Sequence, residues 1–198
     1  MKVYGDMRSG NCYKIKLVAA LLGIAYEWVP LDVMAGETRT TQFTAKNPNA
    51  KIPLLELDDG RVLWESNAII DFLARGSALL PDEPYAQAQI LQWQFFEQYS
   101  HEPYIAVARF IARFQGLPDS RRAEYEAKQA GGHKALAVME TRLAAHAYLV
   151  GSHLSVADIT LYAYTHVAHE GGFELSGYPG ILAWLTRIQS EPRFVGME

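Results

Sequence analysis

Residues 51–73 read KIPLLELDDGRVLWESNAIIDFL and join several structural signals in one short run. A proline at position 53 directly precedes residues 54–57, an apolar segment with the composition of a β-strand. Asp-Asp-Gly at positions 58–60 supplies the residues that a tight chain reversal needs. Residues 61–64 then form a second short, mostly apolar segment. The sequence therefore predicts a β-hairpin at this position.

Ser66 follows the hairpin and is a suitable N-cap for a helix that continues to about residue 73. Two interpretations of this junction are open. In the first, it is only the capped start of a surface helix. In the second, it is an anion site, because the unpaired N–H groups at a helix N-terminus bind carboxylates. A cis Pro53 would in addition leave neighbouring backbone groups free to pair with a peptide-like ligand.

The composition indicates a folded protein of one large domain or two small ones. The chain has 198 residues, of which 49% are hydrophobic and 20% are charged. A formal net charge of -4 argues against nucleic acid as a partner. There is no apolar run long enough to span a membrane, and the N-terminal residues lack the apolar core of a secretory signal. Cys12 is the single cysteine, so we expect no internal disulfide and a cytoplasmic location.

Strand and helix patterns alternate through residues 1–76 in the order β-α-β-(α)-β-β-α, which predicts a small mixed sheet with helices on its faces. Residues 77–84 contain two prolines and are interpreted as a linker. The pattern of residues 85–198 is helical almost throughout and predicts an all-helical domain, with its first helix bent or broken near Pro103. Within this domain, residues 155–158 (Ser-Val-Ala-Asp) predict a capping box.

This order of elements resembles the cytosolic glutathione transferase family. The resemblance rests on Asn47-Pro48, Lys51-Ile52-Pro53, Glu65-Ser66 and the capping box, which follow in family order across nearly the whole chain. It implies a thioredoxin-like N-terminal domain (βαβαββα, mixed four-stranded sheet) and an all-α C-terminal helical bundle. The N-terminal motif is similar to that of the serine-type classes, such as the tau, zeta and theta types, and of bacterial members.

The resemblance also implies how glutathione would bind. Glu65 and Ser66 match the pair that binds the γ-glutamyl end, with Ser66 and its helix N-terminus taking the carboxylate. Ile52, which precedes a presumed cis Pro53, matches the residue whose backbone pairs with the cysteinyl part. Lys51 matches a polar position that contacts the glycyl or cysteinyl part in several classes, and a solvated surface lysine is the alternative interpretation.

The thiol of glutathione needs activation, because a free thiol has a pKa of about 8.5 and is mostly protonated at neutral pH. A helix N-terminus and a hydroxyl that donates to sulfur can both stabilise the thiolate. Ser9 matches the serine of the serine-type classes, in a pattern resembling Ser-x-x-[Ser/Cys]-x-[Arg/Lys]-[Val/Ile]. Three alternatives stay open: Tyr4, at the strand position of the tyrosine-type classes; Cys12, which could form a mixed disulfide as in the omega and beta types; and Asn11, as a donor to sulfur.

A pocket for a hydrophobic electrophile is expected along the helix that faces the first domain in this family. Its candidate residues are Tyr99, His101, Tyr104, Val107 and Phe110. An aromatic stripe at helical spacing is also typical of a protein core. The histidines do not form a metal-ligand grouping with cysteine or acidic residues, so we expect no metal. Glutathione is expected as a cosubstrate, and no other cofactor is implied.

The sequence thus predicts a glutathione transferase of the detoxifying kind, in which the thiolate attacks a small hydrophobic electrophile. One alternative is a glutathione-dependent isomerase or thiol–disulfide reductase. Another is a non-enzymatic interaction protein with the same fold. The resemblance further implies a homodimer, with neither nucleic acid nor a membrane as a partner.

Overall fold

The computed structural model describes residues 1–197, which divide into two units. Residues 1–77 and 192–197 form the first unit, and residues 78–191 form the second. The helical pattern predicts a domain that extends over residues 85–198, whereas residues 192–197 belong with the first unit. No helix within residues 1–197 combines the length and the apolar character that crossing a membrane requires.

Four short strands form the sheet of the first unit in the order β2-β1-β3-β4. They are β1 (Lys2–Gly5), β2 (Glu27–Pro30), β3 (Leu54–Glu56) and β4 (Val62–Trp64). β1 pairs with β2 in parallel and with β3 antiparallel, and β3 pairs with β4 antiparallel. The sheet is therefore mixed, and the hairpin lies where the Asp-Asp-Gly turn predicts it.

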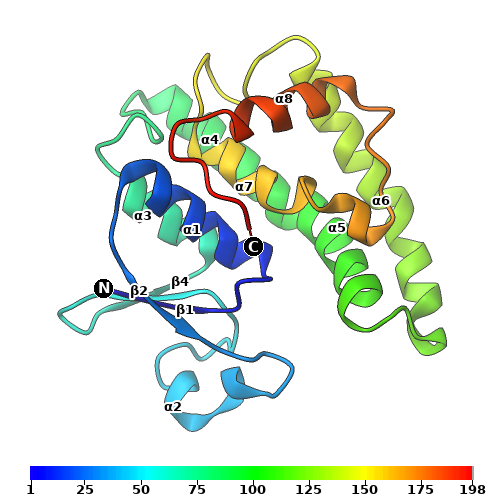
Figure 1. Cartoon of the computed structure of the whole chain (residues 1–198). Coiled ribbons are helices and arrows are strands. Elements are labelled where there is room, and N and C mark those ends of the chain that lie inside the picture. Colours follow the sequence, from blue (N-terminus) through cyan, green and yellow to red (C-terminus); the bar gives the residue numbers. More distant parts are fainter. Residues whose placement is uncertain (198) are drawn as a thin grey trace. The chain divides into compact units, whose positions relative to one another are not determined.

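Helices cover both faces of this sheet (Figure 1). α1 (Gly10–Leu22) and α3 (Ser66–Ala74) lie on one face, and the short α2 (Thr41–Thr44), preceded by a 3-10 turn at Glu37–Arg39, lies on the other. Gly5 faces α1 so closely that a Cβ atom there would lie 2.5 Å from the Cys12 sulfur. Because successive strand residues point to opposite faces, Tyr4 faces away from α1.

The segment 192–197 runs beside α1 (Figure 1). The Tyr13 hydroxyl donates to the carbonyl of Val195 at 2.8 Å, and the Lys16 ammonium group donates to the carbonyl of Met197 at 3.0 Å. Met197 is buried. These contacts explain why the segment belongs with the first unit, although it follows the helical unit in the chain.

The second unit is built from helices and the loops between them. Its α-helices are α4 (Pro84–Phe96), α5 (Glu102–Arg109), α6 (Asp119–Leu143), α7 (Val156–Thr165) and α8 (Pro179–Gln189), with a 3-10 turn at Ala168–Gly171. The α-helical pattern is interrupted close to Pro103, as the sequence predicts: a π-helical turn at Glu97–His101 connects α4 to α5, and Pro103 lies in the first turn of α5. A second π-helical turn, Phe110–Phe114, follows α5.

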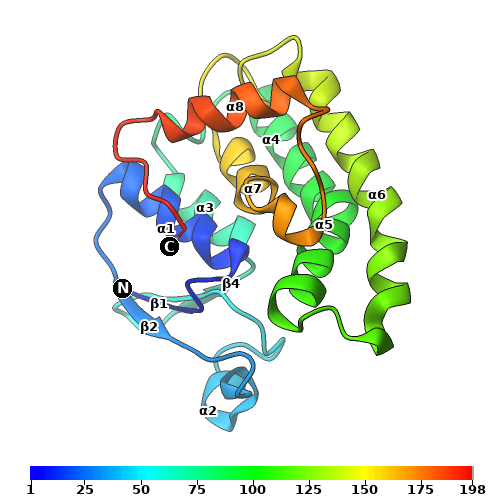
Figure 2. The ribbon, with the colours of Figure 1, turned by 45° about the vertical axis from the view of Figure 1, so that its right-hand side comes forward.

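α7 is the centre of this helical unit. It lies between the other helices in Figure 2, and all ten of its residues are buried. The predicted capping box is present at its start. The Asp158 carboxylate accepts hydrogen bonds from the backbone N–H and the hydroxyl of Ser155, at 3.0 and 2.9 Å. It also accepts from the Leu149 N–H and the Trp184 indole, both at 2.9 Å. Asp158 therefore joins three segments of the unit as well as capping a helix.

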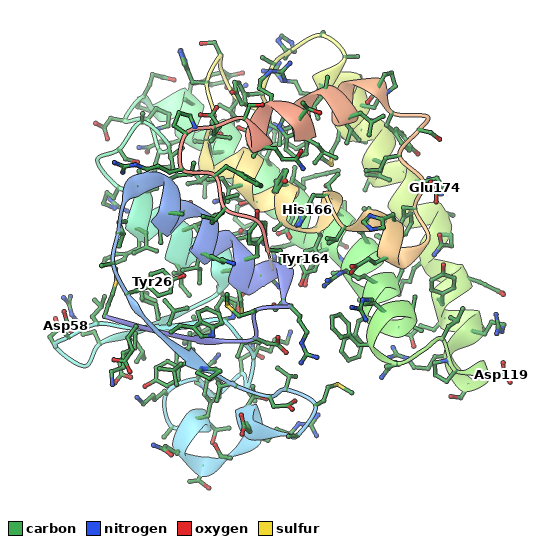
Figure 3. The ribbon with its side chains drawn as sticks, in the orientation of Figure 1. Tyr26, Asp58, Asp119, Tyr164, His166 and Glu174 are labelled. Carbon is green, nitrogen blue, oxygen red and sulfur yellow. The ribbon has the colours of Figure 1, made fainter. Side chains whose placement is uncertain are left out.

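His166 lies at the C-terminal end of α7 (Figure 3), and its ring stacks on Tyr162 with ring centroids 4.7 Å apart. Its Nδ1 atom lies 2.8 Å from the Tyr162 carbonyl oxygen. Burial lowers the pKa of His166 from 6.5 to about 4, and the charge of Arg109 acts in the same direction, against the Tyr162 carbonyl and Glu170. The folded protein therefore holds this imidazole in its neutral form.

We expect the free energy of unfolding to fall as the pH drops from about 6.5 towards 4, because the unfolded chain binds a proton at His166 that the folded chain excludes. Each pKa unit corresponds to about 1.4 kcal/mol, so the shift from 6.5 to about 4 contributes at most about 3.5 kcal/mol to the loss. Urea unfolding at pH 7 and at pH 4.5 measures it. His166→Phe keeps a stacked ring and should lose less stability between the two pH values than the wild type. Equal losses would contradict the prediction.

Candidate functional site

Ser9 is the N-cap of α1, with an extended backbone at φ -81 and ψ 124. Its hydroxyl oxygen accepts a hydrogen bond from the Cys12 N–H at 3.4 Å. The hydroxyl also forms a side-chain hydrogen bond with the buried Cys12 thiol, which acts to lower the pKa of that thiol. The side chain is half-buried and stands at the positive end of the helix dipole. A hydroxyl in this position can donate to a thiolate.

Cys12 lies in the first turn of α1 and is 1% exposed. Its sulfur packs against Gly5, and burial raises the pKa of the thiol to about 12, although a hydrogen bond with Ser9 acts in the opposite direction. At neutral pH the side chain is a protonated thiol, which is a poor nucleophile. The structure favours the interpretation of Cys12 as a small buried residue.

The Tyr4 hydroxyl is on the opposite face of the sheet from α1. It donates to the Glu56 carboxylate, and it accepts a hydrogen bond from the Lys46 ammonium group at 3.0 Å. Tyr4 therefore has two polar partners on the face that carries α2, whereas Ser9 is at the start of a helix on the other face. This placement separates Tyr4 from the other candidates for thiol activation.

The start of α3 meets the start of α1 around Ser66. Ser66 is the first residue of α3, and Glu65 takes the N-cap position with a positive φ of 70°, so the prediction of Ser66 as the N-cap is wrong by one residue. The buried Ser66 hydroxyl donates to the Asn11 side-chain oxygen at 3.2 Å. The carboxylate site predicted at Ser66 is thus contiguous with the first turn of α1, where Ser9 and Asn11 lie.

Lys14 is also part of this region, although its sequence pattern does not predict a role in the site. It is 0% exposed, and its ammonium group donates to the Ser66 hydroxyl and to the Asn67 side-chain oxygen, each at 3.2 Å. The one sign in the sequence that Lys14 has a special role is that a lysine interrupts the apolar spacing of α1. Its partners could not be predicted, because they lie more than fifty residues away in sequence. An ammonium ion beneath Ser66 adds positive charge to the N-terminus of α3.

Residues 47–52 form a loop that is fixed from within by Asn47. The buried Asn47 amide donates to the Lys51 carbonyl at 2.8 Å, and its side-chain oxygen accepts from the Asn49 N–H at 3.0 Å. The Asn49 side chain donates to the Glu65 carboxylate at 3.4 Å. The loop ends at the Ile52-Pro53 peptide bond, which is cis. This confirms the isomer that the resemblance implies.

Ile52 and Lys51 differ in what they offer to a ligand. Within residues 1–197 no acceptor pairs with the Ile52 N–H, so this group is open to a peptide-like ligand. The Lys51 side chain is exposed, which fits both a surface lysine and a residue that contacts the ligand from the edge of the site. Its role therefore stays a prediction.

The five candidates for the electrophile pocket have different surroundings. His101 is fully buried, with Nε2 2.9 Å from the Thr165 hydroxyl of α7. Tyr104 lies over Gly131 of α6, where a Cβ atom would be 2.2 Å from its ring. Tyr99 is 86% exposed. Val107 and Phe110 are half-buried. The pocket stays a prediction, and His101 and Tyr104 have packing partners inside the helical unit.

No group of three or more histidine, cysteine, aspartate or glutamate residues in the described part of the chain is arranged to hold a metal ion.

Two family models match this chain. The model of the glutathione S-transferase N-terminal domain matches residues 1–75, and the model of the C-terminal domain matches residues 88–192. The chain belongs to the glutathione S-transferase family. This confirms both the resemblance and the predicted combination of a thioredoxin-like domain with a helical domain.

This family member is similar to named relatives over nearly its whole length. The probable glutathione S-transferase GSTF2 of Oryza sativa subsp. japonica is 31% identical over 202 residues, which cover 97% of this chain and 93% of that protein. A glutathione S-transferase from Pseudomonas fluorescens Pf-5 has a crystal structure that superposes with a TM-score of 0.98, at 65% identity, covering 99% of this chain and 98% of that one. A maleylacetoacetate isomerase from Methylobacterium extorquens AM1, crystallised with malonate and glutathione, is 29% identical with a TM-score of 0.81, covering 96% and 92%.

Proposed function

We propose that this transferase conjugates glutathione to a small hydrophobic electrophile, with Ser9 as the catalytic residue that stabilises the thiolate. The observation that carries the proposal is the half-buried Ser9 hydroxyl at the N-cap of α1, at the positive end of the helix dipole. A hydrogen bond to a charged acceptor contributes about 1.5–3 kcal/mol, which is enough to lower a thiol pKa by one to two units.

In the proposed complex the γ-glutamyl carboxylate binds at Ser66 and the first N–H groups of α3, close to Glu65. The ammonium group of Lys14 lies next to the Ser66 hydroxyl, so that the site for this carboxylate contains a cation as well as a helix N-terminus. The cysteinyl part pairs with the backbone of Ile52 beside the cis Pro53. This arrangement directs the ligand sulfur towards Ser9.

A thermal-shift titration with glutathione tests the binding site. A ligand at 100 times its Kd stabilises the folded state by about 2.7 kcal/mol, so the wild type should melt at a higher temperature in millimolar glutathione. Ser66→Ala should weaken binding about tenfold, because it removes a carboxylate ligand. Ser120→Ala is the matched control, since Ser120 is exposed at the start of α6. A wild type that glutathione does not stabilise would favour the non-enzymatic interaction protein.

A second candidate is glutathione-dependent isomerisation, which the likeness to the maleylacetoacetate isomerase favours. The two reactions differ in their use of the thiol. Conjugation consumes one free thiol for each product formed, whereas isomerisation regenerates it. Thiol titration during turnover of an aryl halide and of an unsaturated cis-dicarboxylate therefore separates them.

We also propose that the transferase forms a homodimer in the cytoplasm, as members of this family commonly dimerise. Three large apolar side chains stand exposed at positions i, i+4 and i+8 of α4 and the turn that follows it: Leu91 at 46%, Phe95 at 71% and Tyr99 at 86%. Sedimentation equilibrium should give twice the chain mass for the wild type and a lower average mass for Phe95→Lys. A monomeric wild type would contradict this part of the proposal.

A further inference from the structure

Three side chains form a polar cluster on the face of the sheet that carries α2. The Tyr4 hydroxyl of β1 donates to the Glu56 carboxylate of β3. Lys46, which follows α2, donates to the Tyr4 hydroxyl at 3.0 Å and pairs with the same carboxylate. The Lys46 ammonium group also lies 4.9 Å from the centroid of the Tyr4 ring. Lys46 therefore has three contacts with the neighbouring strands β1 and β3: the Tyr4 hydroxyl, the Tyr4 ring and the Glu56 carboxylate.

The side-chain hydrogen bond between Lys46 and Glu56 raises the pKa of the ammonium group and lowers the pKa of the carboxyl group, and hydrogen bonds with Tyr4 act in the same directions. Both groups are partly exposed, with side-chain exposures of 28% and 22%. Solvent screening therefore limits the contribution of this pair to overall stability. The main effect of the cluster is therefore to fix the position of the backbone at Lys46.

Lys46 is followed directly by Asn47, the residue that fixes the loop 47–52 through the Lys51 carbonyl and the Asn49 N–H. Asn49 in turn reaches the Glu65 carboxylate. The Tyr4 hydroxyl is therefore connected to the loop that precedes Ile52 by hydrogen bonds on either side of the covalent link between Lys46 and Asn47. The hydrogen bonds of the three cluster side chains join them to one another and do not involve Ser9 or Ser66 in the described residues.

We propose that Tyr4, Lys46 and Glu56 are positioning residues of the glutathione site, which hold the loop 47–52 so that the Ile52 backbone meets the cysteinyl part of the ligand. This inference rests on the proposed function. The cluster acts on the loop alone, so its loss weakens binding of glutathione. The thiolate, once bound, still meets Ser9 on the other face of the sheet. The Tyr4 hydroxyl thus serves ligand binding without touching the ligand.

Tyr4→Phe removes one oxygen atom and keeps the ring under the ammonium group, and Lys46→Met removes the charge and keeps the length. We expect Kd and KM for glutathione to rise about threefold to tenfold in both variants, the effect of about one lost hydrogen bond, while kcat at saturating glutathione stays within about twofold. Lys46→Arg retains the cation and should restore most of the affinity. Tyr85→Phe is the matched control, since Tyr85 is 70% exposed in the second unit.

Amide hydrogen exchange gives a measurement that needs no ligand. Exchange at residues 49–51 should become faster in Tyr4→Phe and Lys46→Met, while exchange within α1 stays at the wild-type rate. Unchanged exchange in this loop, or an unchanged Kd together with a lower melting temperature, would overturn the inference. A wild type that binds no glutathione would instead overturn the proposed function, so the two failures are distinguishable.

Discussion

Ser9→Ala is expected to lower kcat for conjugation about 10- to 100-fold, because it removes one hydrogen bond of about 1.5–3 kcal/mol to the thiolate. The Kd for glutathione should change little, since the γ-glutamyl carboxylate and the cysteinyl backbone bind elsewhere. The ultraviolet absorbance of the bound thiolate, measured against pH, reports the cause directly. In the variant the pKa of bound glutathione should rise towards the free value of about 8.5.

The variant also loses a helix cap, which contributes about 1 kcal/mol to stability. Ser9→Thr separates the two effects, because threonine retains a hydroxyl for both the cap and the sulfur. Its rate should lie near that of the wild type. Cys12→Ala is the second comparison and should keep most of the rate, since the buried Cys12 thiol is protonated at neutral pH. A large loss in Cys12→Ala with no loss in Ser9→Ala would assign the chemistry to the cysteine.

Asp158→Ala is expected to lower the free energy of unfolding by about 3 to 5 kcal/mol, which exceeds the loss of a simple helix cap. The reason is the number of donors left without an acceptor. The carboxylate accepts four hydrogen bonds, from Ser155 twice, from the Leu149 N–H and from the Trp184 indole, all in the buried interior of the second unit. Urea unfolding followed by tryptophan fluorescence measures the loss.

Asp158→Asn keeps one side-chain oxygen and should lose roughly half as much stability, because its amide group faces the Ser155 donors. Asp119→Ala is the matched control. Asp119 lies in the first turn of α6 with a side chain that is 97% exposed, so its replacement should change stability by less than about 1 kcal/mol. A loss in Asp158→Ala no larger than that of the control would show that the four bonds add no net stability.

Local chemistry explains what the sequence predicted well. The Asp-Asp-Gly turn and the Ser155–Asp158 capping box depend on residues within four positions of one another, and both are where the sequence places them. The cis Pro53 followed from resemblance rather than from local signals. The π-helical turn at Glu97–His101 was not predicted, because a helical pattern of apolar residues does not show where one extra residue enters a turn.

The long-range polar contacts could not be predicted from the sequence for a different reason. Lys14 and Ser66 are 52 residues apart in sequence, as are Tyr4 and Glu56. Each pair is brought together by the packing of the first unit, which no spacing rule encodes. The predicted role of Ser9 thus came from family resemblance, and that of Ser66 from the local helix-start pattern together with the resemblance. Lys14 and the Tyr4 cluster became visible only in the structure.

The segment 192–197 has a consequence for how this chain is synthesised. Because residues 78–191 stand between residue 77 and this segment, the helical unit is topologically an insertion within the first unit. A ribosome makes the whole helical unit before it makes the partners of Tyr13 and Lys16 on α1. All residues of the helical unit lie in one uninterrupted stretch of chain. The first unit, by contrast, receives residues 192–197 only after the helical unit has been synthesised.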